Sequence, residues 1–211
     1  YRDLLLTFDD ASATISGQTD RQTDRQRRIA VEWLTLDAIS ENCDAQRRPV
    51  TKRDRKSGQY PYYGASGIVD YVDRYIYDGE YLLISEDGAN LLARVTPIAF
   101  SISGKCWVNN HAHVVRFENM VTQRYVELYF NHLDLKPYIT SAAQPKLSQN
   151  SLYKIKIPVP SMPDQIQIVE CLGEYEKVYL ELISQINNEI ELREKQYSFY
   201  RDKLLSFSEV A

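Results

Sequence analysis

Six basic side chains crowd one short segment of this 211-residue sequence. They are Arg47, Arg48, Lys52, Arg53, Arg55 and Lys56, with Asp54 as the one acid between them. Lysine and arginine neutralise DNA phosphates and release bound counterions, so their contacts weaken as the salt concentration rises. Most charge runs are simply solvated, and that remains the alternative interpretation here. The residue types predict that this segment contacts phosphate groups.

Neutral polar side chains that suit base reading follow several short apolar runs. An asparagine or glutamine amide can pair with an adenine edge, and an arginine can pair with guanine in the major groove. The candidates for DNA contact are Tyr62, Ser66, Asn90, Arg94, Asn109, Asn110, His111, Gln144, Lys146, Gln149 and Asn150. Two asparagines after a strand are also an ordinary turn, and clustered tyrosines also suit a core, so both alternatives stay open.

The charge of the chain is unevenly distributed although the formal net charge is only −4. Residues 1–45 carry −4, residues 46–160 carry +5 and residues 161–211 carry −5. A basic middle between acidic flanks is typical of a nucleic-acid surface confined to one part of a protein. The distribution therefore favours DNA binding by the middle segment.

Motifs for catalysis are missing from the sequence. It contains no Gly-x-Gly-x-x-Gly, no Walker phosphate loop and no Asn/Asp-Pro-Pro-aromatic run, which predicts no methyltransferase or ATPase activity. Carboxylates at Asp78, Glu80, Glu86 and Asp87 could hold magnesium for a nuclease, although Glu86-Asp87-Gly88 is more simply a turn. We expect a non-catalytic chain without a bound cofactor.

Cysteine spacing and hydropathy indicate a cytoplasmic protein. Cys43, Cys106 and Cys171 are far apart and lack paired spacing, so we expect buried thiols rather than a disulfide framework or a metal site. No run approaches the roughly 20 apolar residues of a membrane span. No charged start followed by an apolar run suggests a signal peptide.

Between Ile29 and Pro160 the sequence predicts a mixed α/β (α+β) domain dominated by a β-sheet. Runs rich in β-branched and aromatic residues predict strands, and wider apolar spacing predicts helices. Expected strands cover 67–72, 81–85, 97–102, 106–108 and 112–117, and expected helices cover 33–39 and 124–135. Three prolines between Ile157 and Pro163 are expected to exclude regular structure and to end the domain.

A long helix is expected from about residue 164 to residue 206. Ser161 and Asp164 have the spacing of a capping box, and the sole glycine that follows is Gly173. Apolar residues recur mostly in steps of three and four at Ile168, Leu172, Tyr175, Tyr179, Leu182, Ile186, Ile190, Tyr197, Tyr200, Leu204 and Phe207. Such a helix would be roughly 60–65 Å long, too long to bury this stripe against its own domain. We therefore expect a coiled coil with a partner helix rather than a terminal helix folded onto the sheet.

The first residues of the chain repeat its last ones. Tyr-Arg-Asp-Leu-Leu-Leu-Thr-Phe at 1–8 matches Tyr-Arg-Asp-Lys-Leu-Leu-Ser-Phe at 200–207 in six of eight positions. Residues 9–28 are rich in Asp, Ser, Thr, Gln and Arg, as linkers are. We therefore interpret 1–28 as the tail of a preceding repeat helix plus a linker, and the chain as one of two tandem halves or a piece cut to that shape.

Six stretches of the sequence form an ordered set of motifs. They are GQYPYYGASGI at 58–68, LISEDGANL at 83–91, GKCWVNNHAH at 104–113, QPKLSQ at 144–149, IPVP at 157–160 and YRDKLL at 200–205. Together they resemble the specificity subunit of type I restriction-modification systems. In that family two target-recognition domains are each followed by a long helix, and the two helices pack antiparallel as a spacer. The resemblance implies a target-recognition domain at 29–160 and a spacer or dimerisation helix at 161–208.

The resemblance also implies partners. A single recognition domain would read one half of a bipartite site in double-stranded DNA. Methyltransferase subunits would bring S-adenosylmethionine, and restriction subunits would bring ATP and magnesium. A second copy or second half-subunit would pair through Leu172, Tyr175, Tyr179, Leu182, Ile186, Ile190, Tyr197 and Leu204. The residues alone leave one further alternative, a coiled-coil assembly adaptor whose globular domain binds protein.

Overall fold

The computed structural model describes residues 13–15, 27–140 and 144–207. The repeat at residues 1–8 and most of the expected linker lie outside these ranges. Packing divides the chain into two units, one ending at Val169 and one beginning at Glu170. The division falls inside a helix, nine residues beyond the domain end expected at residue 160.

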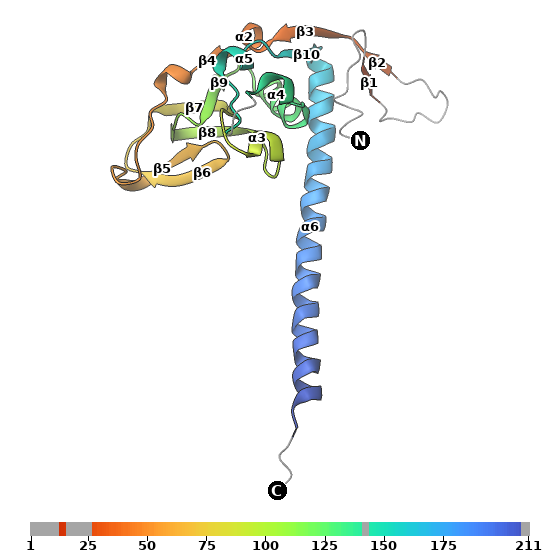
Figure 1. The fold of residues 1–211 in the computed structure, drawn as a ribbon. Helices are drawn as coiled ribbons and strands as arrows, with labels where there is room; N and C mark the ends of the chain where they lie inside the picture. The colour runs from red at the N-terminus through yellow and green to blue at the C-terminus, as the bar shows by residue number, and fades with distance from the viewer. Residues whose placement is uncertain (1–12, 16–26, 141–143, 208–211) are drawn as a thin grey trace. The chain divides into compact units, whose positions relative to one another are not determined.

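A six-stranded mixed sheet is the centre of the first unit, in the order β4-β9-β7-β8-β5-β6 (Figure 1). The strands are β4 (Glu41–Asn42), β5 (Ser57–Gly64), β6 (Gly67–Val72), β7 (Tyr77–Ser85), β8 (Ala99–Val108) and β9 (Ala112–Arg116). β5 and β8 run parallel, and the other neighbours run antiparallel. The predicted sheet is confirmed, although the separate runs expected at 97–102 and 106–108 form one strand. Their polar junction stays paired, with Gly104 opposite Gly79.

Alternating side chains of the central strands bury one core. Tyr77, Leu83, Ile102, Cys106 and Val114 belong to this cluster together with Cys43. The two cysteines are buried as expected, whereas Cys171 is only partly buried. Burial raises the pKa of the Cys106 thiol to about 12, so this thiol stays protonated and unreactive near neutral pH.

Helix α4 (Met120–His132) packs against β7 and β8. It confirms the helix expected at 124–135, shifted toward the N-terminus. The shift has a local cause, because the Asn119 side chain accepts a hydrogen bond from the Thr122 N–H (2.8 Å) and so caps an earlier first turn. Its buried face includes Tyr125, Val126 and Phe130.

Two expectations at the start and end of the first unit are wrong. Residues 33–35, expected to be helical, belong to strand β3 (Val31–Thr35), and only α2 (Leu36–Ile39) is helical. The proline-rich exit, expected to be irregular, contains strand β10 (Lys156–Pro160), which pairs antiparallel with β3. A two-stranded ribbon tolerates prolines because each strand has one side without a ladder partner.

The remaining elements of the described chain are short. Strands β1 (Ala13–Ile15) and β2 (Arg27–Ile29) pair antiparallel within the segment expected to be a linker. The other short elements are η1 (Asp44–Gln46), α3 (Asn90–Ala93), η2 (Lys136–Tyr138) and α5 (Gln149–Leu152).

The predicted long helix is confirmed as α6 (Met162–Leu205), 44 residues in length (Figure 1). That length corresponds to about 65 Å. The Ser161 hydroxyl donates to Asp164 Oδ2 (2.6 Å), so the expected capping pair forms. Apolar side chains from Tyr175 to Leu205 are exposed. Charged side chains are spaced along the whole helix, and within the described ranges no helix meets the length and hydropathy of a membrane span.

Candidate nucleic-acid interface

Four loops of the first unit meet where β5, β7 and β8 end. We call them the loop cluster: residues 64–67 after β5, 86–90 after β7, 109–111 after β8, and 144–148. Backbone hydrogen bonds join three of them, because the Glu86 N–H donates to His111 O (2.9 Å) and the Leu147 N–H donates to Glu86 O (2.7 Å). The fourth is attached by the Ser85 hydroxyl, which donates to Ala65 O (2.5 Å). Loops that lie as far apart in the sequence as residues 64–67 and 144–148 therefore form one surface.

Five predicted DNA contacts are exposed on the loop cluster: Ser66, Asn110, His111, Gln144 and Lys146. They supply a hydroxyl, two amides, an imidazole and an ammonium, which is the variety of donors and acceptors that base reading needs. His111 Nδ1 lies 2.9 Å from Asp87 Oδ1, and Lys146 Nζ lies 3.0 Å from Glu86 Oε1. These two acids hold the imidazole and the ammonium at the surface.

The segment with the six basic side chains, residues 47–56, starts beside the loop cluster, and we call it the basic segment. The Arg48 N–H donates to Val108 O (3.2 Å), and Trp107 Nε1 donates to Arg48 O (2.7 Å). Beyond this attachment to β8, the side chains of Arg48, Lys52, Arg53 and Lys56 are exposed. The unit therefore presents four exposed cations on a segment that adjoins the polar surface.

Arg55 of the same segment is partly buried. It lies over the Tyr62 ring, 4.3 Å from the ring centroid, and pairs with Asp70 (3.2 Å). Hydrogen bonds from the Tyr71 N–H and from Arg55 lower the pKa of Asp70. Arg55 thus fastens the basic segment to the β5–β6 hairpin.

Three predicted contact residues, Arg47, Tyr62 and Asn109, support these loops from within the protein, whereas a fourth, Arg94, is attached to the end of α4. Arg47 pairs with Asp44 (3.0 Å) and Glu86 (2.5 Å). Tyr62 is buried, and its hydroxyl accepts from the Val50 N–H (3.0 Å). Asn109 is buried beneath its turn and accepts from the His111 N–H (2.8 Å), while Arg94 donates to carbonyls at the end of α4. Their contacts with DNA remain predictions, and the exposed residues form the candidate surface.

Three other candidates have local roles. Asn90 Nδ2 donates to Thr96 O (2.9 Å), and Asn90 Oδ1 accepts from the Thr96 N–H (3.0 Å), so the side chain braces the turn after α3. Gln149 and Asn150 line a cavity of about 610 Å³ whose other lining residues include Asp37 and Ser40. Gln149 and Asn150 lie outside the four loops of the cluster.

A buried charge network underlies the loop cluster. His113 Nδ1 lies 2.7 Å from Asp44 Oδ2, and Arg47 bridges Asp44 and Glu86. Burial raises the pKa of Glu86, but hydrogen bonds from Arg47 and Lys146 outweigh it and leave that pKa below its usual value. Sequence reasoning missed Asp44 and His113; the one signal was a histidine inside the apolar run of β9.

The nuclease interpretation gains no support from the carboxylates. Asp78 and Glu80 are exposed on β7, whereas Glu86 and Asp87 pair with basic side chains of the loop cluster. Across the part of the chain that the structure describes, no group of three His, Cys, Asp or Glu residues could hold a metal ion.

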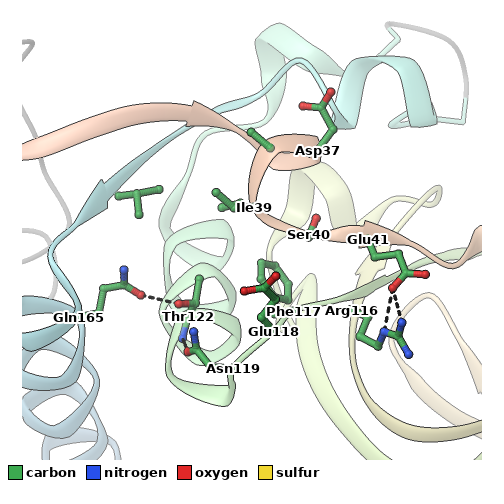
Figure 2. Close-up of a pocket in the computed structure, with 12 residues that line it drawn as sticks. Asp37, Ile39, Ser40, Glu41, Arg116, Phe117, Glu118, Asn119, Thr122 and Gln165 are labelled. Carbon is green, nitrogen blue, oxygen red and sulfur yellow. Dashed lines mark hydrogen bonds and ion pairs between the residues drawn. The ribbon is translucent and has the colours of Figure 1, made fainter.

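A second surface of the first unit is hollowed but acidic. A cavity of about 730 Å³ is lined by Asp37, Glu41 and Glu118, with Arg116 already paired to Glu41 (Figure 2). Thr122 donates to Gln165 Oε1 (2.9 Å) at the same cavity. Three carboxylates repel phosphate groups, so the loop cluster is the better candidate for nucleic acid.

Comparisons with known proteins identify one family. The family model for the type I restriction modification DNA specificity domain matches residues 31–192. A putative type I restriction enzyme specificity subunit of Haemophilus influenzae is 37% identical over 85% of this chain and 47% of its own length. The EcoprrI specificity subunit of Escherichia coli is 28% identical over 83% and 39%. The chain thus spans less than half the length of these relatives.

Solved structures show the same fold. The type I S subunit of M. genitalium matches with a TM-score of 0.59 at 11% identity, over 91% of this chain and 49% of that one. The HsdS subunit of Thermoanaerobacter tengcongensis matches with a TM-score of 0.54 at 13% identity, over 95% and 49%.

Proposed function

This chain belongs to the type I restriction-modification DNA specificity family, and from that premise we propose that its first unit reads one half of a bipartite DNA target. The observation that carries the proposal is the loop cluster. It gathers five exposed polar side chains from separate parts of the chain and adjoins a segment of exposed cations. Phosphate contacts position a protein on DNA, and base contacts specify the sequence, so these two surfaces supply complementary parts of recognition.

The two surfaces have different proposed roles in DNA binding, which follow from their charge. Arg48, Lys52, Arg53 and Lys56 contact phosphates and set the register of the unit on the duplex. Ser66, Asn110, His111, Gln144 and Lys146 face the base edges. The amides favour adenine, whereas the ammonium of Lys146 favours guanine O6 and N7.

The second unit provides pairing rather than reading. We propose that the apolar stripe of α6 packs against the same helix of a second copy of this chain. Leu182, Ile186 and Ile190 are about half exposed in the isolated chain. Full burial of such a side chain contributes roughly 1.5–3 kcal/mol, so covering its exposed half contributes about half of that, and the sum along a helix this long favours pairing. Because a two-fold dimer mirrors a palindrome, the paired recognition units address an inverted repeat.

The catalytic steps belong to other subunits in this proposal. The chain has no activity of its own and directs methyltransferase and restriction subunits to DNA in the cytoplasm. S-adenosylmethionine binds to the methyltransferase subunits, and ATP and magnesium bind to the restriction subunits. Membership of the family supports this division, since the relatives above are specificity subunits.

Binding to random duplex DNA at rising salt tests the reading function. We expect the logarithm of the affinity to fall linearly with the logarithm of the salt concentration, with a slope of about −4 if the four exposed cations each meet a phosphate. A protein-binding adaptor would instead show little DNA binding at any salt concentration, and that result would refute the proposal.

Sequencing of methylated adenines tests the bipartite target. Cells that express this chain with its methyltransferase subunits should carry methylation at an inverted repeat with a fixed gap. Methylation without an inverted repeat would contradict pairing of two identical recognition units.

A further inference from the structure

His113 is buried at the base of the loop cluster and contacts two acceptors. It lies on β9 and has no exposed surface. Its Nδ1 lies 2.7 Å from Asp44 Oδ2, and its Nε2 lies 2.9 Å from the backbone oxygen of Leu147. A carbonyl oxygen can only accept, so Nε2 must carry a proton.

The surroundings of Asp44 require a proton on Nδ1 as well. Asp44 Oδ1 accepts from the Val114 N–H (2.7 Å), and Asp44 Oδ2 lies 3.0 Å from an Arg47 guanidinium nitrogen. Two donors, one of them charged, hold this carboxylate in its ionised form. An ionised carboxylate can only accept from Nδ1, so with Asp44 ionised the two contacts require a proton on each ring nitrogen, which is the imidazolium form of His113.

Charge balance leads to the same conclusion. The buried part of the network holds two carboxylates, Asp44 and Glu86, whose side chains are 6% and 11% exposed. The Arg47 guanidinium neutralises one of them, and Lys146, half exposed, reaches Glu86 only from the surface. Buried charges are stable when they are paired. The imidazolium of His113, 3.8 Å from Glu86, supplies the second buried positive charge.

The contact with Leu147 fixes a loop that carries two of the predicted reading residues. Leu147 is held on both sides of its peptide, because its N–H donates to Glu86 O (2.7 Å) and its oxygen accepts from His113. Its side chain is buried. Lys146 precedes this anchor directly, and Gln144 lies two residues further back, both exposed.

We propose that His113 is a positioning residue for DNA reading, which as a buried imidazolium between Asp44 and Leu147 holds the 144–148 loop and thereby orients Gln144 and Lys146. The orientation toward DNA rests on the proposed function, whereas the anchoring of the loop does not. His113 itself touches no DNA. Removing it should impair discrimination between sequences while leaving the phosphate contacts of the basic segment intact.

Two measurements without DNA test the anchor. In protein labelled with ¹⁵N-histidine, we expect protons on both His113 ring nitrogens at neutral pH, with the His113→Gln spectrum assigning the signal among the three histidines. In His113→Gln the Leu147 amide should exchange its hydrogen about tenfold faster or more, since its flanking hydrogen bond is lost. A neutral His113 ring would overturn the imidazolium form, and unchanged Leu147 exchange in the folded variant would overturn the anchoring role.

A third measurement tests the consequence for reading. Wild-type protein first enriches duplexes from a random-sequence pool. His113→Gln should bind the enriched duplexes about tenfold more weakly or worse, with its affinity for the unselected pool within about twofold. Tyr125→Phe is the matched control, because it removes another buried hydrogen bond, from the Tyr125 hydroxyl to Pro158 O, outside the loop cluster. It should leave Leu147 exchange and both affinities within about twofold.

The outcomes separate the two proposals. Equal loss of binding to both pools by His113→Gln, or an equal effect of Tyr125→Phe, would overturn the positioning role. Failure of the wild-type protein to bind any duplex would instead refute the proposed function, and Leu147 exchange would still decide whether His113 anchors the loop.

Discussion

In the proposed function, individual cations set how strongly the protein binds DNA of any sequence. Lys52 and Arg53 are exposed at the tip of the basic segment, where Thr51 accepts a backbone hydrogen bond from the Asp54 N–H (3.0 Å). Each phosphate contact that is lost reduces the magnitude of the slope of log affinity against log salt concentration by about 0.9. The double variant Lys52→Gln/Arg53→Gln should therefore lower the slope by about 2 and weaken binding to selected and random duplexes alike.

Lys156→Gln provides the matched control for this double variant. Lys156 is also exposed in the first unit but lies on β10, which pairs with β3 rather than with the basic segment. Fluorescence anisotropy across a salt series measures both proteins. A slope unchanged by the double variant, or lowered equally by Lys156→Gln, would show that the basic segment does not contact phosphate.

Glu86 links the surface of the loop cluster to the stability of the unit. Burial raises its pKa, but hydrogen bonds from Arg47 and Lys146 outweigh that effect and lower it overall. Because the folded-state pKa is lower than the unfolded one, the ionised form stabilises the fold above the unfolded pKa. This contribution is lost as the pH falls through the folded pKa. Glu86→Gln should therefore be less stable than wild type at about pH 7, with a difference that shrinks below about pH 4.

Urea unfolding at the two pH values measures this difference. Glu80→Gln serves as the control, because Glu80 is exposed on β7 and should change stability little at either pH. A destabilisation by Glu86→Gln that does not depend on pH would mean that packing, and not the charge of Glu86, accounts for its effect.

At the scale of elements, the β5–β6 turn sets the position of Ser66 in the loop cluster. Gly67 has φ +123°, a conformation that side-chain-bearing residues rarely adopt, although no atom lies within 4 Å of a Cβ built there. Gly67→Ala should therefore destabilise the first unit by about 1–3 kcal/mol through backbone strain alone.

Gly173, inside α6, also has open space but ordinary helical backbone. Gly173→Ala should instead favour the helix by about 1 kcal/mol.

Opposite signs for the two glycine substitutions in chemical or thermal unfolding would support this account. Equal effects would show that the turn relaxes without strain. The Gly67→Ala protein also tests recognition, because a displaced turn moves Ser66 and should reduce binding to selected duplexes more than binding to random ones.

Elements that carry their own pattern were predictable from the sequence, and elements defined by distant partners were not. Helix α6 and the central strands have a periodicity that local physics determines. Strand β3 has apolar spacing that also suits a helix, and its structure depends on pairing with β10 more than 120 residues later. The candidate site divides the same way. The exposed polar residues that we propose read bases could be selected by residue type, whereas the Asp44–His113–Leu147 contacts span 69 and 34 positions that no local pattern encodes.

At the scale of the whole molecule, charge distinguishes the middle of the chain from its C-terminal part. Residues 46–160 carry +5, whereas residues 161–211 carry −5. A negative helix is repelled by DNA and does not compete with the loop cluster for phosphate. The apolar stripe along this acidic helix therefore suits a protein partner, and in the proposed pairing a second copy of α6 would present a stripe of equal length.

Pairing through α6 predicts that Leu182→Asp/Ile186→Asp converts a dimer into a monomer. Both residues lie on the apolar stripe and are 52% and 45% exposed in the isolated chain. Placing two carboxylates in a buried seam is costly because neither has a partner charge. Leu180→Asp is the matched control, since Leu180 is 59% exposed but lies about 120° around the helix from the stripe. Light scattering coupled to gel filtration should report a dimer for wild type and Leu180→Asp, and a monomer for the double variant.

The monomer should still bind a single half-site, because the loop cluster belongs to the first unit, but should lose its preference for an inverted repeat. A monomeric wild type at high concentration, or an unchanged mass of the double variant, would refute the seam and leave half-site reading to be judged separately.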